Sequence, residues 1–159
     1  MSRWPSGTRQ GSLDLASFVA QLLTPNVTAP LPEPWHGPYS EHRAAAWIKD
    51  RDDEGTALLV VERATGNPMG LVLLHVSPEI RKPDSELRLG YLLAESYWGR
   101  GFATELLGGF VEWARTASYR RVVAGVASDN AASRRVLEKS GFTRKREATG
   151  SEDLYVILV

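Results

Sequence analysis

The sequence predicts a mixed α+β fold, in which a central, mostly antiparallel sheet is flanked by helices. Two strand-like runs, Thr56 to Val61 and Met69 to Val76, are joined by the turn residues of Arg63 to Pro68 and form a predicted hairpin. A third run, Glu86 to Leu93, leads through a glycine-containing loop into a helical pattern and then into the buried run Arg121 to Ala127. A hairpin and a strand–helix–strand unit together indicate one sheet of mixed direction.

Composition narrows the class of protein. The 159 residues suit one domain, spanning residues 1–159, that buries its own core. Lysine plus arginine and aspartate plus glutamate both number 19, so net charge favours neither a nucleic acid nor an anionic membrane as partner, and any cationic site must be local. The absence of cysteine excludes disulfides, thiolate metal sites and a cysteine nucleophile. We see no signal peptide and no membrane-spanning apolar run, so we expect a cytoplasmic protein.

Two helices and a proline-rich segment are predicted before the first hairpin. Residues 1–12 are polar, so we expect any strand there to be short and weak. Leu13 to Leu23 has a helical apolar stripe with Ser12 as its N-cap, and a second helix follows the Ser40 cap to about Asp50. Thr24 to Tyr39 contains five prolines, which we interpret as excluding regular structure.

The C-terminal part continues the pattern with a helix and two strands. A helix from Ala131 to Ser140 follows the buried run, and Gly141 stands where a left-handed C-cap is expected. Phe142 to Glu147 and Leu154 to Val159 are the predicted closing strands.

The loop between the third strand and its helix has the chemistry of an anion site. In Trp98-Gly-Arg-Gly-Phe-Ala103, glycines let backbone amides approach a phosphate, and the positive end of the helix dipole adds attraction. A Walker loop needs a Gly-Lys-Ser/Thr ending, which is absent. A dinucleotide fingerprint needs a third glycine where Thr104 stands.

This loop resembles the acetyl-CoA loop of the GNAT acyltransferase superfamily, Gln/Arg-x-x-Gly-x-Gly/Ala, with the match at Gly101 and Ala103. Asp129 to Phe142 resembles the second hallmark of the superfamily, Asn-x-x-(Ala/Ser)…Gly-Phe. Trp98 departs from the usual first residue of the loop but is common in the branch that acetylates the alanine or serine N-termini of ribosomal proteins. The chain is most similar to that branch, and the resemblance covers roughly residues 40 to 159.

The resemblance implies acetyl-CoA as the cofactor. Loop amides would hold the pyrophosphate, the end of the third strand would pair with the pantetheine arm, and the side-chain amide of Asn130 would contact that arm. For Asn130 a plain N-cap is the alternative. The implied cofactor-binding residues are Tyr91, Leu92, Leu93, Trp98, Gly99, Arg100, Gly101, Phe102, Ala103, Thr104, Asn130 and Ser133.

In this family an amine attacks the thioester directly in a ternary complex. The backbone N–H of Leu92 or Leu93 would then stabilise the oxyanion. Many relatives place a tyrosine four residues before the Gly-Phe pair as the acid for the thiolate, and in this sequence that position is Leu137. Ser133 matches the serine of the N-terminal-acetylating branch and would donate a hydrogen bond to the thiolate. A helix serine bonded to the backbone behind it is the alternative.

Glu86, at the start of the third strand, is the candidate general base, and an ion pair with Arg88 or another cation is the alternative. Glu33 and His36 in the proline-rich segment are outside candidates for the same role.

Aromatic residues of the proline-rich segment, Trp35, His36 and Tyr39, are candidates for lining the substrate pocket. His36, His42 and His75 lack metal-ligand spacing, so we expect no metal site.

The sequence thus predicts an acetyl-CoA-dependent N-acetyltransferase that acts on a primary amine, either a peptide N-terminus or a small molecule. A non-catalytic CoA-binding regulatory domain is the alternative from a different class, and Leu137 is the feature in its favour. An antibiotic or polyamine acetyltransferase of the same fold is a further alternative. A homodimer through the last strands is also consistent with the sequence.

Overall fold

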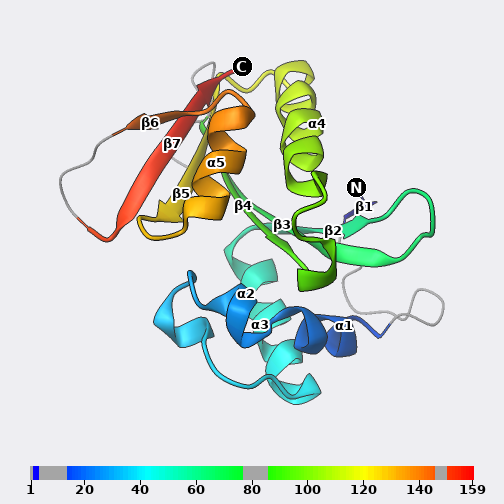
Figure 1. The fold of residues 1–159 in the computed structure, drawn as a ribbon. Helices are drawn as coiled ribbons and strands as arrows, with labels where there is room; N and C mark the ends of the chain where they lie inside the picture. The colour runs from blue at the N-terminus through cyan, green and yellow to red at the C-terminus, as the bar shows by residue number, and fades with distance from the viewer. Residues whose placement is uncertain (1, 4–13, 77–85, 146–149) are drawn as a thin grey trace. The chain divides into compact units, whose positions relative to one another are not determined.

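The computed structural model describes residues 2–3, 14–76, 86–145 and 150–159. The strands are β1 (Ser2–Arg3), β2 (Thr56–Val61), β3 (Pro68–Val76), β4 (Glu86–Leu93), β5 (Arg121–Ala127), β6 (Thr143–Lys145) and β7 (Glu152–Leu158). The helices are α1 (Leu15–Leu22), α2 (Pro25–Thr28), α3 (Glu41–Glu54), α4 (Phe102–Thr116) and α5 (Ala131–Lys139), with short 3-10 turns at Glu33–Trp35 and Glu95–Tyr97. Hydrogen-bonded strands follow the order β1-β2-β3-β4-β5-β7-β6 (Figure 1). The predicted mixed, mostly antiparallel sheet with flanking helices is confirmed.

The chain divides into two compact units. The first comprises Met1–Leu74 and Tyr91–Tyr97, and the second comprises His75–Gly90 and Trp98–Val159. Strand β4 therefore contributes its first residues to the second unit and its last residues to the first. The single domain over residues 1–159 stays a prediction.

The first unit is built on the predicted hairpin. Strands β2 and β3 pair antiparallel from Thr56 opposite Leu74 to Val61 opposite Pro68. The two residues of β1 pair with Leu58 and Leu59 of β2, which matches the expected short first strand. The core of this unit joins helices and strands, and its buried members are Val19, Leu22, Leu23, Val27, Ala44, Trp47, Ala57, Leu59, Leu71 and Leu92.

Helix α1 begins later than the sequence predicts. Its N-cap is Asp14, whose Oδ1 accepts hydrogen bonds from the amides of Ala16 at 3.1 Å and Ser17 at 3.4 Å. The predicted start at Leu13 is therefore wrong, and Ser12, the predicted cap, lies outside the described residues. Aspartate and serine are about equally good caps, so sequence alone does not choose between them.

The proline-rich segment is more regular than predicted. Pro25 starts α2, where its missing N–H costs nothing and its fixed φ suits a helix. The Thr24 hydroxyl oxygen caps that helix by accepting a bond from the Val27 amide at 3.3 Å. A 3-10 turn follows at Glu33–Trp35. The prediction of no regular structure over Thr24 to Tyr39 is thus wrong for these two short pieces.

Helix α3 keeps its predicted cap, because the Ser40 hydroxyl oxygen accepts a bond from the Arg43 amide at 3.1 Å. The helix continues to Glu54, past the predicted end near Asp50. Its last turns carry a Lys49–Asp53 ion pair at 2.6 Å, spaced i,i+4 on the surface. Such pairs give a charged stretch modest helical support, which the apolar periodicity did not reveal.

The second unit contains the predicted strand–helix–strand unit. Strands β4 and β5 run parallel over three residue pairs, from Glu86 opposite Arg121 to Arg88 opposite Val123, with α4 between them in sequence. On its other side β5 pairs antiparallel with β7, and β7 pairs with β6. Helices α4 and α5 contact each other in this unit (Figure 1).

Helix α5 ends as predicted, at a glycine with a left-handed backbone. Gly141 has a φ of 90°, its amide donates to the Glu138 carbonyl, and the Phe142 amide donates to the Leu137 carbonyl. These two bonds form a Schellman motif. The closing strands differ from prediction at their ends: β6 covers Thr143–Lys145 and β7 begins at Glu152. Glu147, the predicted end of β6, lies outside the described residues.

Among the residues that the structure describes, no helix has both the length and the apolar character needed to cross a membrane.

Candidate functional site

The glycine loop of the second unit leads into α4 with two left-handed residues. Gly99 has a φ of 68° and Gly101 a φ of 83°. A side chain would be strained at either position, since L-residues rarely adopt such angles. A Cβ placed at either glycine would meet no atom within 4 Å, so the backbone faces open space there. At these two positions, glycine therefore leaves the space beside the backbone unfilled.

Helix α4 starts without a side-chain cap. Gly101 is its N-cap residue and offers no side chain, while its carbonyl accepts the first helical bond from the Glu105 amide at 3.1 Å. Helix starts leave amides without helical partners, and those of Ala103 and Thr104 are in this position. Together with the dipole of a 15-residue helix, these amides suit an anion such as a pyrophosphate.

Two larger side chains flank the loop. Trp98 is 47% exposed, which makes it one of the most exposed large hydrophobic residues described. The Arg100 guanidinium carbon lies 4.9 Å from the centroid of the Phe102 ring. This cation–π contact holds the arginine near the start of α4.

The cofactor-binding residues predicted on β4 lie in the first unit. Tyr91 is half-buried, and Leu92 and Leu93 are buried. The next residue, Ala94, donates its amide to the Met69 carbonyl at 2.8 Å. The end of β4 is therefore held on β3.

Asn130 is the N-cap of α5. Its Oδ1 accepts a hydrogen bond from the Ser133 amide at 3.2 Å, so the capping interpretation is confirmed. The cap uses the side-chain oxygen and leaves the role of the Nδ2 donor to be tested. Ser133 is half-buried in the first turn of α5.

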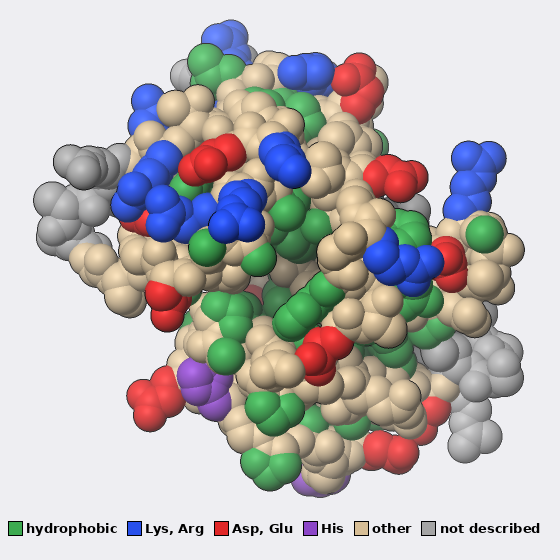
Figure 2. All heavy atoms as spheres, in the orientation of Figure 1, with side chains coloured by type: hydrophobic (Ala, Val, Ile, Leu, Met, Phe, Trp, Pro, Cys, Tyr) green, Lys and Arg blue, Asp and Glu red, His purple; other side chains and the backbone are tan. Residues whose placement is uncertain are grey.

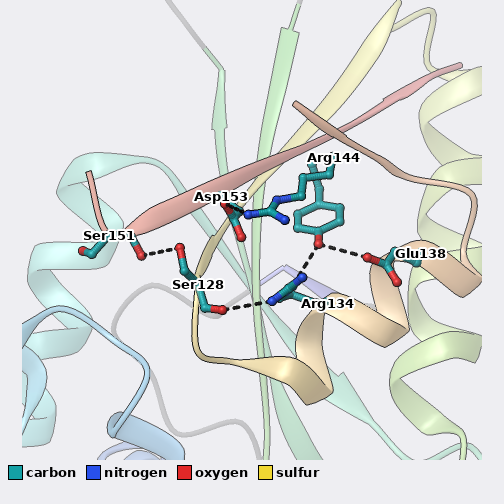
Figure 3. Close-up of polar contacts among 7 residues, drawn as sticks. Ser128, Arg134, Glu138, Arg144, Ser151 and Asp153 are labelled. Atoms are coloured by element: carbon teal, nitrogen blue, oxygen red, sulfur yellow. Dashed lines mark hydrogen bonds and ion pairs between the residues drawn. The ribbon is translucent and has the colours of Figure 1, made fainter. Parts of the chain in front are cut away.

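A polar network fixes α5 on β7 (Figure 3). The Tyr155 hydroxyl, on a side chain that is 0% exposed, accepts a bond from Arg134 Nε at 3.2 Å and donates to Glu138 Oε1 at 3.1 Å. Arg134 Nη1 also donates to the Ser128 carbonyl at 3.1 Å. The bond with Tyr155 raises the pKa of Arg134. These contacts hold the helix that carries Asn130 and Ser133, and sequence reasoning missed them because they join distant residues.

Two more polar contacts join β7, or the residue just before it, to β6 and to the end of β5. Arg144 Nη2 donates to Asp153 Oδ1 at 2.7 Å, and the Ser128 hydroxyl donates to the Ser151 carbonyl at 3.0 Å (Figure 3). Asp153 is 8% exposed. A carboxylate in this setting needs its arginine, because an unpaired buried charge is costly.

Glu86 lies between two arginines. Its Oε2 is 2.7 Å from Arg121 Nη2, and its Oε1 is 3.5 Å from Arg88 Nε. Glu86 and Arg121 are also register partners at the start of the parallel pairing. The structure thus gives Glu86 the ion pairs that were the alternative to a general base, and its catalytic role stays a prediction.

In the first unit, the three predicted substrate residues lie on one folded segment. The Tyr39 hydroxyl donates to the Trp35 carbonyl at 3.0 Å, and a ring nitrogen of His36 is 2.8 Å from the Leu31 carbonyl. Partial burial raises the pKa of Tyr39, and the positive charges of Arg43 and Arg51 oppose this effect. The structure brings Trp35 and Tyr39 together, and the Tyr39 hydroxyl is used in a hydrogen bond within the segment.

Arg43 organises this segment, a role that the sequence pattern did not predict. Its guanidinium donates to three backbone carbonyls, those of Pro34 at 3.2 Å, His36 at 2.6 Å and Pro38 at 2.9 Å. Gly37 has a φ of 100°, and a Cβ there would lie 3.0 Å from Arg43 Nη1. A glycine at position 37 is therefore part of the same arrangement.

Trp35 is fixed by two residues of α3. Its ring meets Trp47 edge-on with 5.3 Å between centroids, and the Arg51 guanidinium carbon is 4.4 Å from its centroid. Aromatic and cation–π contacts of this kind add to apolar burial. The segment that carries the substrate candidates is therefore rigidly supported.

The segment after β4 is tied to α2. Glu95 accepts bonds from the Thr24 hydroxyl at 2.6 Å and from Asn26 Nδ2 at 2.7 Å. The bond from Thr24, and then the bond from Asn26, lower the pKa of Glu95. The ionised carboxylate thus holds the chain just before the glycine loop.

Basic side chains gather over α5 and β6 of the second unit (Figure 2). The exposed members on these elements are Arg135, Lys139, Arg144 and Lys145. Positive charge is therefore concentrated locally although the formal net charge is +0, as an anion-binding role requires.

Leu137 is 0% exposed in the core of the second unit. At the position where many relatives carry an acid, this chain therefore has a side chain that packs in the core. No group of three or more metal-ligand side chains occurs within the described ranges.

Comparison with known families decides the identity of the fold. A profile of the acetyltransferase (GNAT) domain family matches residues 9–143. The chain belongs to the GNAT acetyltransferase family. Among curated protein sequences, none matches it.

Solved structures agree with this assignment. The RimL ribosomal L7/L12 α-N-protein acetyltransferase in complex with CoA is 19% identical, with a TM-score of 0.71 over 91% of this chain and 88% of that one. The aminoglycoside acetyltransferase AAC(6')-Ib in complex with CoA is 20% identical, with a TM-score of 0.72 over 91% and 89%. The Vibrio cholerae spermidine N-acetyltransferase is 20% identical, with a TM-score of 0.67 over 90% and 89%. At these identities the likeness shows the GNAT fold.

Proposed function

We propose that this GNAT protein transfers an acetyl group from acetyl-CoA to a primary amine by direct attack in a ternary complex. The observation that carries the proposal is the uncapped start of α4 behind Gly99 and Gly101. Relatives of the same fold have been solved with CoA, and acetyl-CoA when bound supplies an acetyl thioester. Backbone that is free of side chains suits the pyrophosphate of that group.

The residues that would hold CoA fall into two sets. The loop residues Trp98 to Thr104 would bind its phosphates, with Arg100 adding charge. The end of β4, Tyr91 to Leu93, would pair with the two amides of the pantetheine arm. Asn130 would add its Nδ2 donor, because its Oδ1 is used in the cap.

The chemistry requires little from the chain. A C–N bond forms as the C–S bond breaks, and the proton that the amine loses balances the thiolate that leaves. A backbone amide of Leu92 or Leu93 would stabilise the charge on the carbonyl oxygen. Ser133 would donate a hydrogen bond toward the thiolate. Glu86 would serve as base only if one carboxylate oxygen leaves its arginines, so water is the simpler proton acceptor.

For the acceptor we propose a peptide N-terminus, as in the ribosomal-protein branch, bound near Trp35, His36 and Tyr39. A small polyamine is the second candidate acceptor, because relatives of this fold act on aminoglycosides and spermidine. We propose a cytoplasmic enzyme that needs neither nucleic acid nor membrane. A homodimer through the last strands is part of the same proposal.

A non-catalytic CoA-binding domain is the second candidate function. The buried Leu137 favours it, because the position that we took for the acid holds a core side chain. The alternative predicts CoA binding without acetyl transfer to any amine.

The test combines binding with turnover. Isothermal titration should show that the folded protein binds acetyl-CoA, and a protein that stays folded without binding it would contradict the whole proposal. Thiol release should then be measured with peptides of differing N-terminal residue, aminoglycosides and polyamines. Release with one amine class identifies the acceptor, whereas binding with no release across the panel favours the non-catalytic domain.

A further inference from the structure

Glu95 binds the start of the proline-rich segment through both of its carboxylate oxygens. Oε2 accepts a hydrogen bond from the Thr24 hydroxyl at 2.6 Å, and Oε1 accepts one from Asn26 Nδ2 at 2.7 Å. Hydrogen bonds to an ionised carboxylate are stronger than those between neutral groups, and two of them on one carboxylate also restrict its orientation. We call these three residues the Glu95 clamp.

Helix α2 is a firm support for the clamp. Val27 is 4% exposed and belongs to the core of the first unit, and Thr28 is 1% exposed. The Thr28 hydroxyl donates to the Thr24 carbonyl at 3.1 Å. Breaking a hydrogen bond of a buried hydroxyl is costly, so this contact helps to keep the helix in place. Glu95 is therefore bonded to an element that is anchored in the core.

Glu95 also lies three residues before Trp98, where the glycine loop begins. The preceding residue, Ala94, is held on β3 by its bond to the Met69 carbonyl at 2.8 Å, and the Tyr97 amide donates to the Ala94 carbonyl at 2.9 Å. Three residues span at most about 11 Å. The clamp thus restricts where the glycine loop can start.

On its other side, α2 leads to one of the candidate acceptor residues. The Leu31 amide donates to the Thr28 carbonyl at 2.9 Å, and a ring nitrogen of His36 lies 2.8 Å from the Leu31 carbonyl. A carbonyl oxygen only accepts, so this ring nitrogen carries a proton and donates. A series of hydrogen bonds therefore runs from Glu95 through α2 to His36, within the first unit.

The glycine loop is a segment whose entry needs such restriction. Gly99 and Gly101 both have a positive φ, and glycine has more backbone freedom to lose than any other residue. A ligand that binds a loose loop has to offset the entropy of ordering it, so a loop with a fixed entry binds the same ligand more tightly. A clamp that contacts no phosphate can therefore change CoA affinity.

We infer that Glu95 is a positioning residue, which ties the entry of the glycine loop to the proline-rich segment so that both respond when CoA binds. The inference rests on the proposed function, because it takes the glycine loop as the CoA site and the proline-rich segment as the acceptor site. It adds a coupling between the two sites, and a coupling of this kind acts on the affinities of both ligands.

The first test compares Glu95→Ala with Glu62→Ala as a matched control. Glu62 is also half-buried and accepts a bond from a threonine hydroxyl, that of Thr65, at 2.6 Å, but it lies in the turn between β2 and β3. Glu95→Ala should weaken CoA binding about tenfold in titration calorimetry, and Glu62→Ala should leave it unchanged. Equal CoA affinities of the two variants would overturn the inference.

The second test removes the other end of the clamp. Asn26 is exposed and lies 69 positions before Glu95, so Asn26→Ala disturbs neither the core nor the loop directly. It should weaken CoA binding about threefold in wild type and have no further effect in Glu95→Ala, where the bond is already lost. If Glu95→Ala does not fold, Asn26→Ala decides alone, because an unchanged CoA affinity contradicts the inference.

The third test follows His36 by NMR and needs no amine. The probe is adenosine 3′-phosphate 5′-diphosphate, which has the phosphates of CoA and lacks its pantetheine arm. It should shift the Gly101 amide signal in wild type, Glu62→Ala and Glu95→Ala, but shift the His36 ring signals only in the first two. His36 signals that stay still in wild type, or that move equally in Glu95→Ala, overturn the inference.

Failure of the proposed function gives different results. If wild type binds neither CoA nor the nucleotide, the proposed CoA site is refuted and the inference falls with it. If CoA binds and no amine is acetylated, acetyl transfer is refuted, whereas the affinities and the His36 signals still decide whether Glu95 couples the two segments.

Discussion

The two helices that follow the parallel strands of the second unit begin in opposite ways. Helix α5 starts at Asn130, whose side chain caps it, and its first turns are tied to Tyr155 through Arg134. Helix α4 starts at Gly101, which supplies no cap, behind a second left-handed glycine. Amides at a helix start need acceptors, and α5 finds one within the chain. This difference supports our proposal that a ligand provides acceptors at the start of α4.

The largest effect, on CoA affinity, should come from a substitution that blocks the uncapped start of α4. Gly101→Asp places a carboxylate where we propose that the pyrophosphate binds, and aspartate tolerates a left-handed backbone better than most residues. We expect CoA affinity to fall more than about 100-fold while the protein stays folded. Titration calorimetry and circular dichroism measure the two quantities.

Gly66→Asp is the control for that variant, because Gly66 also has a positive φ, 75°, and open space at its Cβ position, outside the glycine loop. It should bind CoA as wild type does. Equal losses in both variants would remove the distinction between the two helix starts.

The next largest effect should come from removing a contact that supports α5. Tyr155→Phe removes a hydroxyl that bonds to both Arg134 and Glu138 at a fully buried position. We expect the free energy of unfolding to fall by about 1–3 kcal/mol, since two polar groups lose a partner. Urea unfolding measures it, and CoA affinity should change little.

Tyr119→Phe is its control, because that half-buried tyrosine makes a ring contact with Trp113 at 5.9 Å between centroids and no hydrogen bond through its hydroxyl among the described residues. A Tyr155 variant no less stable than this control would show that the network does not hold α5.

A smaller effect separates the cap from the ligand contact at Asn130. Asn130→Ala should cost about 1 kcal/mol of stability through loss of the cap. Asn130→Ser keeps a neutral capping oxygen and removes the Nδ2 donor. If Nδ2 contacts the pantetheine arm, Asn130→Ser keeps its stability and binds CoA more weakly; unchanged affinity would make Asn130 a cap alone.

The smallest effect concerns pH. Thr24 and Asn26 hold the pKa of Glu95 below its ordinary value of 4.5, so the ionised form is favoured in the folded protein. This contribution to stability is fully present above the ordinary pKa and is lost as the pH falls through the lowered one. The stability difference between wild type and Glu95→Gln should therefore shrink below about pH 4. A difference that is constant with pH in urea unfolding would contradict this role.

Local signals in the sequence were enough for the two ends of α5, for the Ser40 cap of α3 and for the strand–helix–strand unit. The positive φ of Gly141 and the cap at Asn130 each follow from residues within one turn. Pro25 misled the prediction, because proline suits the first turn of a helix as well as a loop.

Contacts between distant residues were out of reach of the sequence. The Arg134–Tyr155 bond joins residues 21 positions apart, and the Glu95–Thr24 bond joins residues 71 positions apart. Gly70 in β3 has no room for a Cβ, because that atom would lie 2.0 Å from the carbonyl oxygen of Leu92 in another strand. No local pattern encodes such pairs, although each glycine and charge is visible in the sequence.

Strand β4 also sets a limit on how this chain can be divided. Leu92, near its end, is buried in the core of the first unit, whereas Glu86, at its start, is bound to Arg121 of the second. A fragment that stops at Leu74 would leave a hole in its hydrophobic core where Leu92 belongs. Split reporters or circular permutants of this protein should therefore keep Glu86 to Leu93 unbroken and open the chain at the Arg63 to Pro68 turn, whose tip residues are exposed.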